Sequence, residues 1–147
     1  MALPTHTKSW ILQKQPETAV NFSSTADATF ALKTFDIPSS IPEDSLLVKV
    51  VWLSNDAAQR GWIQKGLDPK VCIQQLVVKN DLVMHFSNQR QYMPPVKEGE
   101  VMASYAIAKV IQVGGLADTH KEGDLVYAST GWSEYSIVKK KTSRVIT

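Results

Sequence analysis

Short apolar runs separated by glycine, proline, aspartate and asparagine constrain this chain more than any other feature. Runs of this length between turn-forming residues are typical of β-strands rather than of helices. The sequence predicts strands over five ranges: 29–35, 46–53, 101–113, 124–128 and 132–138. The run 46–53 is apolar at nearly every position, so we expect it to be buried on both faces. Many short strands without an internal repeat favour a mainly β fold, a partly open β-barrel.

One short helical segment is expected within this pattern. Asp56 follows Ser54 and Asn55 and is a good N-cap residue, and the segment ends at Arg60 and Gly61. No helix of ordinary length is expected elsewhere in the chain.

Length and composition indicate one globular domain. The chain has 147 residues, of which 44% are hydrophobic and 20% charged, and its formal net charge is +2. Basic residues are spread along the chain, apart from the lysine run 139–141, so we expect no nucleic-acid partner. The lone Cys72 excludes an intrachain disulfide and fits a reducing compartment. Because the N-terminus is polar and no apolar run reaches membrane-spanning length, we expect a cytoplasmic protein without a membrane partner.

Two motifs in the second half of the chain resemble a known enzyme family. The first is Pro94-Pro95-Val96 followed by Gly99-Glu100-Val101-Met102, and the second is Gly131-Trp132 with Glu134-Tyr135. Together with the Asp56 turn, and in this order, they resemble the N-terminal, GroES-like domain of the zinc-independent medium-chain dehydrogenases/reductases. The match is to the branch of prostaglandin reductases, leukotriene B4 dehydrogenases and alkenal double-bond reductases. The resemblance covers residues 1–147 and implies a GroES-like partly open β-barrel.

The resemblance also implies an NADPH-dependent oxidoreductase. Members of that branch deliver hydride to the β-carbon of an α,β-unsaturated carbonyl compound and a proton to its α-carbon. A dinucleotide site needs a strand, a Gly-x-Gly-x-x-Gly turn and a helix, and none of the seven glycines has that spacing. We therefore expect a truncated chain that lacks the Rossmann domain, the NADP site and the catalytic tyrosine of the family. The catalytic residues of this chain stay unknown.

Three side chains are candidate substrate-binding residues. Asp56 and Arg60 match the family's turn and stand four residues apart, so they either bind a carbonyl or phosphate group or form an intramolecular pair that holds the turn. Tyr92 resembles a tyrosine that contacts substrate in relatives, with a packed loop anchor as the alternative. The chain departs from the family at 57–59, where Ala-Ala-Gln replaces Pro-Tyr-Met. It departs again at 103–105, where side chains replace glycines beside the expected cofactor cleft.

Zinc chemistry is not expected. Metal-dependent relatives need a cysteine near position 55 and a histidine after Gly99, whereas this chain has Asn55 and Glu100. One cysteine and three scattered histidines cannot build a tetrahedral site.

The range 71–89 has no counterpart in the family. Without it, the residues on either side would form the continuous loop that relatives show. The range is either a real insertion, with a hairpin turning at Asn80-Asp81, or a retained intron of the gene.

Three functions remain open from the sequence. The first is the enone reductase, present here in part and serving a biosynthetic pathway. The second is a stand-alone domain that binds or isomerises a small carbonyl compound without redox chemistry, and the third is a non-catalytic interaction module. A GroES-like domain normally covers one flank against its nucleotide domain. We therefore expect an exposed apolar flank here, through which a homodimer or another partner would bind.

Overall fold

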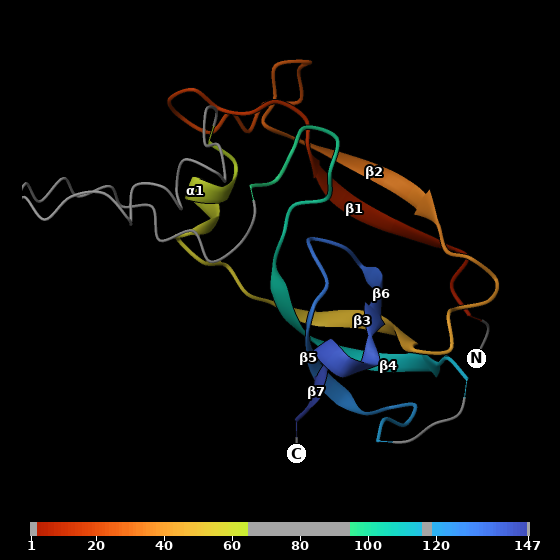
Figure 1. The fold of residues 1–147 in the computed structure, drawn as a ribbon. Coiled ribbons are helices and arrows are strands. Elements are labelled where there is room, and N and C mark those ends of the chain that lie inside the picture. Colours follow the sequence, from red (N-terminus) through yellow and green to blue (C-terminus); the bar gives the residue numbers. More distant parts are fainter. Residues whose placement is uncertain (1–2, 65–94, 116–118, 147) are drawn as a thin grey trace, which may run out of the picture.

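The computed structural model describes residues 3–64, 95–115 and 119–146 (Figure 1). The described residues are mainly β and contain one short α-helix, as the sequence predicted. The elements are β1 His6–Leu12, β2 Phe30–Asp36, β3 Ser45–Leu53, α1 Gln59–Trp62, β4 Tyr105–Val113, β5 Leu125–Ser129, β6 Tyr135–Lys139, the 3-10 helix η1 Lys140–Thr142, and β7 Arg144–Val145. No helix within these ranges is long and apolar enough to cross a membrane.

The strands form two open antiparallel sheets rather than a closed barrel. β1 and β2 make a hairpin, and the larger sheet has the strand order β6-β3-β4-β5-β7. Figure 1 shows the hairpin beside the larger sheet, with α1 on the chain that leaves β3. The expected partly open barrel is therefore open along its edges: its two sheets are joined by isolated bridges and loop hydrogen bonds.

The free edge of β1 makes this junction. Ile11 forms a bridge with Val101, and Ser9 forms one with Ser133. The Met102 N–H donates to the Trp10 carbonyl at 2.9 Å, and the Trp10 N–H donates to the Trp132 carbonyl at 2.8 Å. The strands predicted to start at 101 and 132 consequently start later, at Tyr105 and Tyr135, because the residues before them pair with β1 instead.

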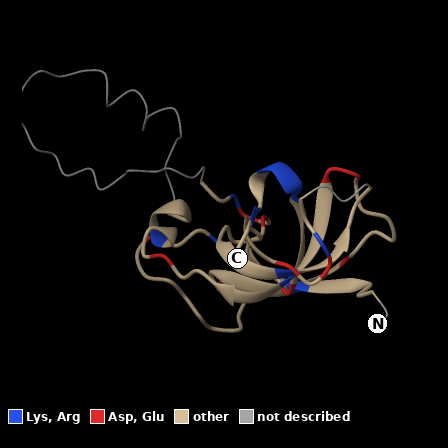
Figure 2. Cartoon of the chain, turned by 90° about the horizontal axis from the view of Figure 1, so that it is seen from below, with Lys and Arg blue, Asp and Glu red and all other residues tan. Residues whose placement is uncertain are grey.

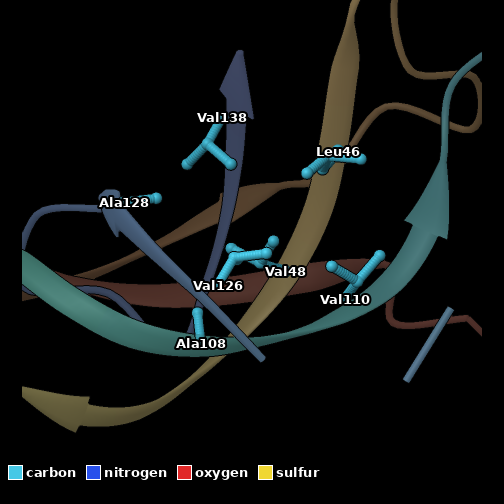
Figure 3. Close-up of a cluster of buried hydrophobic side chains, with 7 residues drawn as sticks. All are labelled: Leu46, Val48, Ala108, Val110, Val126, Ala128 and Val138. Atoms are coloured by element: carbon cyan, nitrogen blue, oxygen red, sulfur yellow. The ribbon is translucent and has the colours of Figure 1, made fainter. Parts of the chain in front are cut away.

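The main core lies on one face of the larger sheet. Buried residues alternate along β4 and β5, as the two-residue period of a strand requires. Figure 3 shows how small and β-branched side chains from four strands meet there: Leu46, Val48, Ala108, Val110, Val126, Ala128 and Val138.

The prediction that 46–53 is buried on both faces is wrong for its second half. Residues 45–48 are buried, but Val51, Trp52 and Leu53 are exposed. β6 pairs only with Ser45–Lys49, and the register of β3 against β4 shifts between Val50 and Trp52. The second half of β3 therefore extends past its neighbour on one edge, and nothing in the described part of the chain covers its outer face.

A second cluster joins the hairpin to α1. Leu12, Trp62, Ile63, Val96 and Met102 are buried together. The Val96 N–H donates to the Trp62 carbonyl at 2.8 Å, so the chain re-enters the described part close to where it left it. The predicted insertion or retained intron at 71–89 lies outside the described residues and stays a prediction.

Charged residues of both signs are scattered along the described part of the chain (Figure 2). In the lysine run 139–141, Lys139 Nζ donates to both carboxylate oxygens of Asp44, at 2.7 and 2.8 Å. This interaction, together with a hydrogen bond from Ser45, lowers the pKa of the Asp44 carboxyl from its ordinary value. Lys140 Nζ donates to the Gly114 carbonyl at 2.7 Å, so part of the run fastens the end of β6 to neighbouring turns.

Candidate functional site

The sequence predicted Asp56 as the N-cap of the helical segment, but the N-cap residue of α1 is Ala58, and Asp56 begins the turn before it. Its Oδ1 accepts a hydrogen bond from the Ala58 N–H at 2.8 Å, and the Gln59 Oε1 accepts one from the Asp56 N–H at 3.1 Å. These two hydrogen bonds cap the turn that precedes α1, whereas α1 itself begins after Ala58 and has no side-chain cap hydrogen bond. The Asp56 carboxylate therefore has a structural role at this turn.

Gln59 and Ser104 fasten the same turn to the chain before β4. The buried Gln59 donates through Nε2 to the Ala103 carbonyl at 3.0 Å, and the buried Ser104 donates through Oγ to the Ser54 carbonyl at 2.7 Å. Both residues were noted only as departures from the family pattern. The structure shows that Gln59 and Ser104 both connect the turn after β3 to the chain before β4.

Arg60 lies against the loop that follows β1. Its Nη2 donates to the Thr18 carbonyl, while its Nη1 is buried and has no hydrogen-bond partner among the described residues. A buried donor without a partner is uncommon in folded proteins, because leaving it unpaired costs free energy. Arg60 thus has one structural contact and one donor that is available for a ligand oxygen.

Tyr92, the third candidate, lies outside the described residues. So do Cys72 and His85. Tyr105, whose phenol was expected beside a cofactor cleft, stacks on Tyr127 with ring centroids 5.2 Å apart and an interplanar angle of 7°.

A hollow of about 660 Å³ lies beside the Asp56 turn. It reaches the turn through Asn55, whereas Asp56 and Arg60 are not among its lining residues. The lining comes from β1, β2, β3 and the chain before β6: Lys8, Trp10, Leu32, Val50, Leu53, Asn55, Trp132, Ser133 and Glu134. A hollow of this size fits a small organic molecule.

The sequence did not indicate Trp10, Leu32 or Trp132 as lining residues. Trp10 and Leu32 are cross-strand partners in the hairpin, so their side chains lie on one face of it. Trp132 does pack, against Phe30 with ring centroids 5.1 Å apart, but it also lines the hollow. Its buried Nε1 has no hydrogen-bond partner among the described residues. Phe30 and Leu32 alternate along β2, but Trp10, Ile11 and Leu12 are consecutive in β1, so the apolar pattern of β1 alone does not single out this face.

The described residues contain no group of three His, Cys, Asp or Glu side chains that could hold a metal ion. His120 is buried, and both of its ring nitrogens have hydroxyl partners: Thr119 at 3.0 Å and Ser143 at 3.1 Å.

Solved structures with a similar fold include a protein in complex with NADPH and a protein described as an NADPH:quinone reductase. CurA from Vibrio vulnificus, in complex with NADPH, matches with a TM-score of 0.64 and 22% identity over 94% of this chain and 32% of that protein. A Mesorhizobium loti protein, provisionally described as an NADPH:quinone reductase, matches with a TM-score of 0.59 and 14% identity over 100% of this chain and 38% of that one. The described residues therefore share the fold of the matching part of these two proteins.

Sequence comparisons identify the family. The family model described as the N-terminal domain of oxidoreductase matches residues 70–146, more than half of the 147 residues. The chain therefore belongs to this family of oxidoreductase N-terminal domains. A Saccharomyces cerevisiae protein described as an uncharacterised membrane protein, YML131W, is 26% identical over 138 residues, which is 91% of this chain and 31% of the yeast protein. The chain spans about a third of the length of the proteins it matches.

Proposed function

We propose that this chain is the substrate-side domain of an NADPH-dependent reductase that acts on the C=C bond of an α,β-unsaturated carbonyl compound in a biosynthetic pathway. The observation that carries the proposal is the family match over residues 70–146. Support for the branch of prostaglandin reductases and alkenal double-bond reductases comes from the order of its motifs. The NADPH-bound relative of the same fold supports the choice of cofactor.

The residues present do not make a dinucleotide site by themselves. None of the seven glycines has the spacing of a phosphate-binding turn, and α1, the one α-helix among the described residues, has four residues. The proposal therefore assigns NADPH binding to a further domain of the whole enzyme. It derives no chemical step from these residues.

In this proposal the chain contributes substrate binding through Asp56, Arg60 and Tyr92. Arg60 Nη1 is the donor that would bind the carbonyl oxygen, since it is buried and has no hydrogen-bond partner among the described residues. Asp56 acts through its cap, which sets the direction of the turn that carries Arg60.

The test is an assay of the longest protein that the gene encodes, with NADPH and a panel of enones, enals and quinones. Oxidation of NADPH that depends on an enone is the expected result. Turnover of quinones alone would show that the substrates are quinones rather than α,β-unsaturated carbonyl compounds in general. No turnover with any acceptor would refute the proposal. A calorimetric titration of NADPH into the 147-residue chain should show no binding.

Substitutions then test the substrate-binding residues. Arg60→Met should raise the KM for the enone about tenfold or more, because a hydrogen bond from a charged donor contributes about 1.5–3 kcal/mol. Asp56→Asn retains the side-chain acceptor and should keep activity, whereas Asp56→Ala loses the cap and should lower it. Arg144→Met, at an exposed arginine of β7, is the matched control. An unchanged KM for Arg60→Met would show that Arg60 does not bind the substrate and has only its structural contact with Thr18.

One observation favours a second function. The described residues form a 660 Å³ hollow, which is large enough for a small carbonyl compound in a stand-alone domain that binds or isomerises such a compound. Enone binding by the 147-residue chain without NADPH, and no NADPH oxidation by the longest gene product, would support that function over the reductase.

A further inference from the structure

A second hollow lies between the hairpin and the loop that joins its two strands. Its volume is about 490 Å³, and five large apolar side chains line it: Trp10, Phe22, Phe30, Leu32 and Trp132. Three of them are largely exposed: Phe22 at 82%, Leu32 at 50% and Trp10 at 44%. Large apolar side chains gathered around one hollow mark a binding site more often than scattered ones do, because exposing them together to water is costly.

Aromatic rings form a continuous wall of this hollow. The ring centroids of Phe22 and Phe30 are 6.4 Å apart with an interplanar angle of 35°, and those of Phe30 and Trp132 are 5.1 Å apart with an angle of 41°. These separations lie in the favourable range for aromatic pairs. Trp10 and Leu32 continue the wall from neighbouring positions of the two hairpin strands.

The side-chain amide nitrogens of Gln13 and Asn21 at the rim already donate hydrogen bonds within the protein. Gln13 Nε2 donates to the Ala26 carbonyl at 2.9 Å, and Asn21 Nδ2 donates to the Asp27 carbonyl at 3.1 Å. Asn21 Oδ1 accepts a hydrogen bond from the Ser23 N–H at 2.9 Å. These hydrogen bonds order the loop in the absence of a ligand, so ligand binding would cost little additional conformational entropy. None of the lining residues carries a charge.

From this geometry we propose that the hollow binds a flat, uncharged aromatic molecule, which stacks on the wall of Trp10, Phe30 and Trp132 while Phe22 covers it. The wall offers ring faces, and no charged residue lines the hollow. A molecule of this kind therefore gains from burial and stacking and loses no hydrogen bonds to water. The hollow does not include the Asp56 turn, although it shares Trp10, Leu32 and Trp132 with the 660 Å³ hollow beside that turn. Phe22 and Phe30 line only the smaller hollow.

The test uses N-phenyl-1-naphthylamine, an uncharged aromatic probe whose emission rises in apolar surroundings. The probe has no carbonyl group and is added without NADPH, so the result is independent of the reductase proposal. The 147-residue chain should bind it saturably, with one probe per chain. Phe22→Ala should raise the Kd about tenfold, the loss expected when part of a buried aromatic contact is removed. Leu32→Asp, which places a charge in the wall, should raise the Kd more than tenfold.

Trp52→Ala is the matched control, because Trp52 is an exposed aromatic residue that does not line the hollow. Its Kd should equal that of the unmodified chain. Circular dichroism should show all three variants folded, since each changed side chain is at least half exposed.

Several results would overturn the proposal: no saturable binding, equal affinities for Phe22→Ala and the unmodified chain, or an equal loss with Trp52→Ala. Tighter binding of the anionic 1-anilinonaphthalene-8-sulfonate would refute the preference for an uncharged ligand. Tighter binding of N-acetyltryptophanamide would identify the occupant as an aromatic side chain of a protein.

Discussion

At the scale of the residue, Gln59 stands where the family pattern has a methionine, and its side chain connects the Asp56 turn to the chain before β4. Its amide accepts a hydrogen bond from the turn at Asp56 and donates one to the Ala103 carbonyl, while Ser104 reaches back to Ser54. Because the two segments are far apart in sequence and both contacts are buried or part-buried, Gln59 stabilises the position of the whole turn. The Asp56 cap and the contact of Arg60 with the loop after β1 both depend on that position.

We expect Gln59→Met to lower the free energy of unfolding by about 1–2 kcal/mol, because the side-chain volume is similar but both hydrogen bonds are lost. Urea unfolding followed by circular dichroism measures the change. Gln64→Met, at an exposed position in the same part of the chain, should change the stability by less than about 0.5 kcal/mol. Equal effects of the two substitutions would contradict the assigned role of Gln59.

At the scale of the element, a glycine is required at the end of β4 but not in the short helix α1. Gly114 follows β4 and is buried against residues 42–45, where a Cβ would lie 2.0 Å from the Pro42 carbonyl oxygen. Gly61 lies within α1, and a Cβ there would have no atom within 4 Å. The first glycine is therefore needed for the close approach of two backbone segments, and the second is not.

Gly114→Ala should destabilise the protein by at least about 2 kcal/mol, because the backbone it contacts cannot move as a flexible side chain can. Gly61→Ala should stabilise it by roughly 0.5–1 kcal/mol, since alanine loses less conformational entropy in a helix. Thermal unfolding measures whether Gly114→Ala is less stable, and Gly61→Ala more stable, than the unmodified chain. A stable Gly114→Ala variant would show that this turn can open without affecting the sheet.

At the scale of the whole molecule, apolar side chains are exposed on the outer face of the larger sheet. Trp52 is 61% exposed, and the register aligns it with Ile107 on β4 and, through Ile107, with Tyr127 on β5. Cross-strand neighbours point to the same side of a sheet, so these residues form one patch together with the stacked Tyr105. An apolar patch of this kind favours association through this face.

The 147-residue chain should accordingly associate with itself as its concentration rises, as measured by sedimentation velocity. Trp52→Lys should weaken the association about tenfold or more, because a large aromatic residue at the centre of an interface contributes strongly to binding. Phe35→Lys changes an exposed apolar residue of the hairpin and should have little effect. A monomer at every concentration would contradict the prediction.

The fold class could be predicted from the sequence because its signals are local. Turn residues and short apolar runs located β2 to β6, although β4 and β6 begin later than predicted, and they did not locate β1 or β7. Asp56 located the turn that leads into α1, since such a turn depends on residues that are close in sequence. The candidate site was predicted in part. Asp56 and Arg60 were found from a motif, but the sequence did not show that Arg60 contacts Thr18 or that the hollows are lined by Trp10, Leu32 and Trp132.

Those features depend on pairing between distant segments. A two-residue period shows that a strand has two faces, but it does not show which strand lies beside it or what covers each face. The sequence by itself therefore determined where strands and turns form. Only the tertiary structure decided that residues 100–102 and 132–134 pair with β1, that the second half of β3 stays exposed, and that Gln59 meets Ala103. Long-range hydrogen bonding and burial select among partners that are equivalent in local sequence.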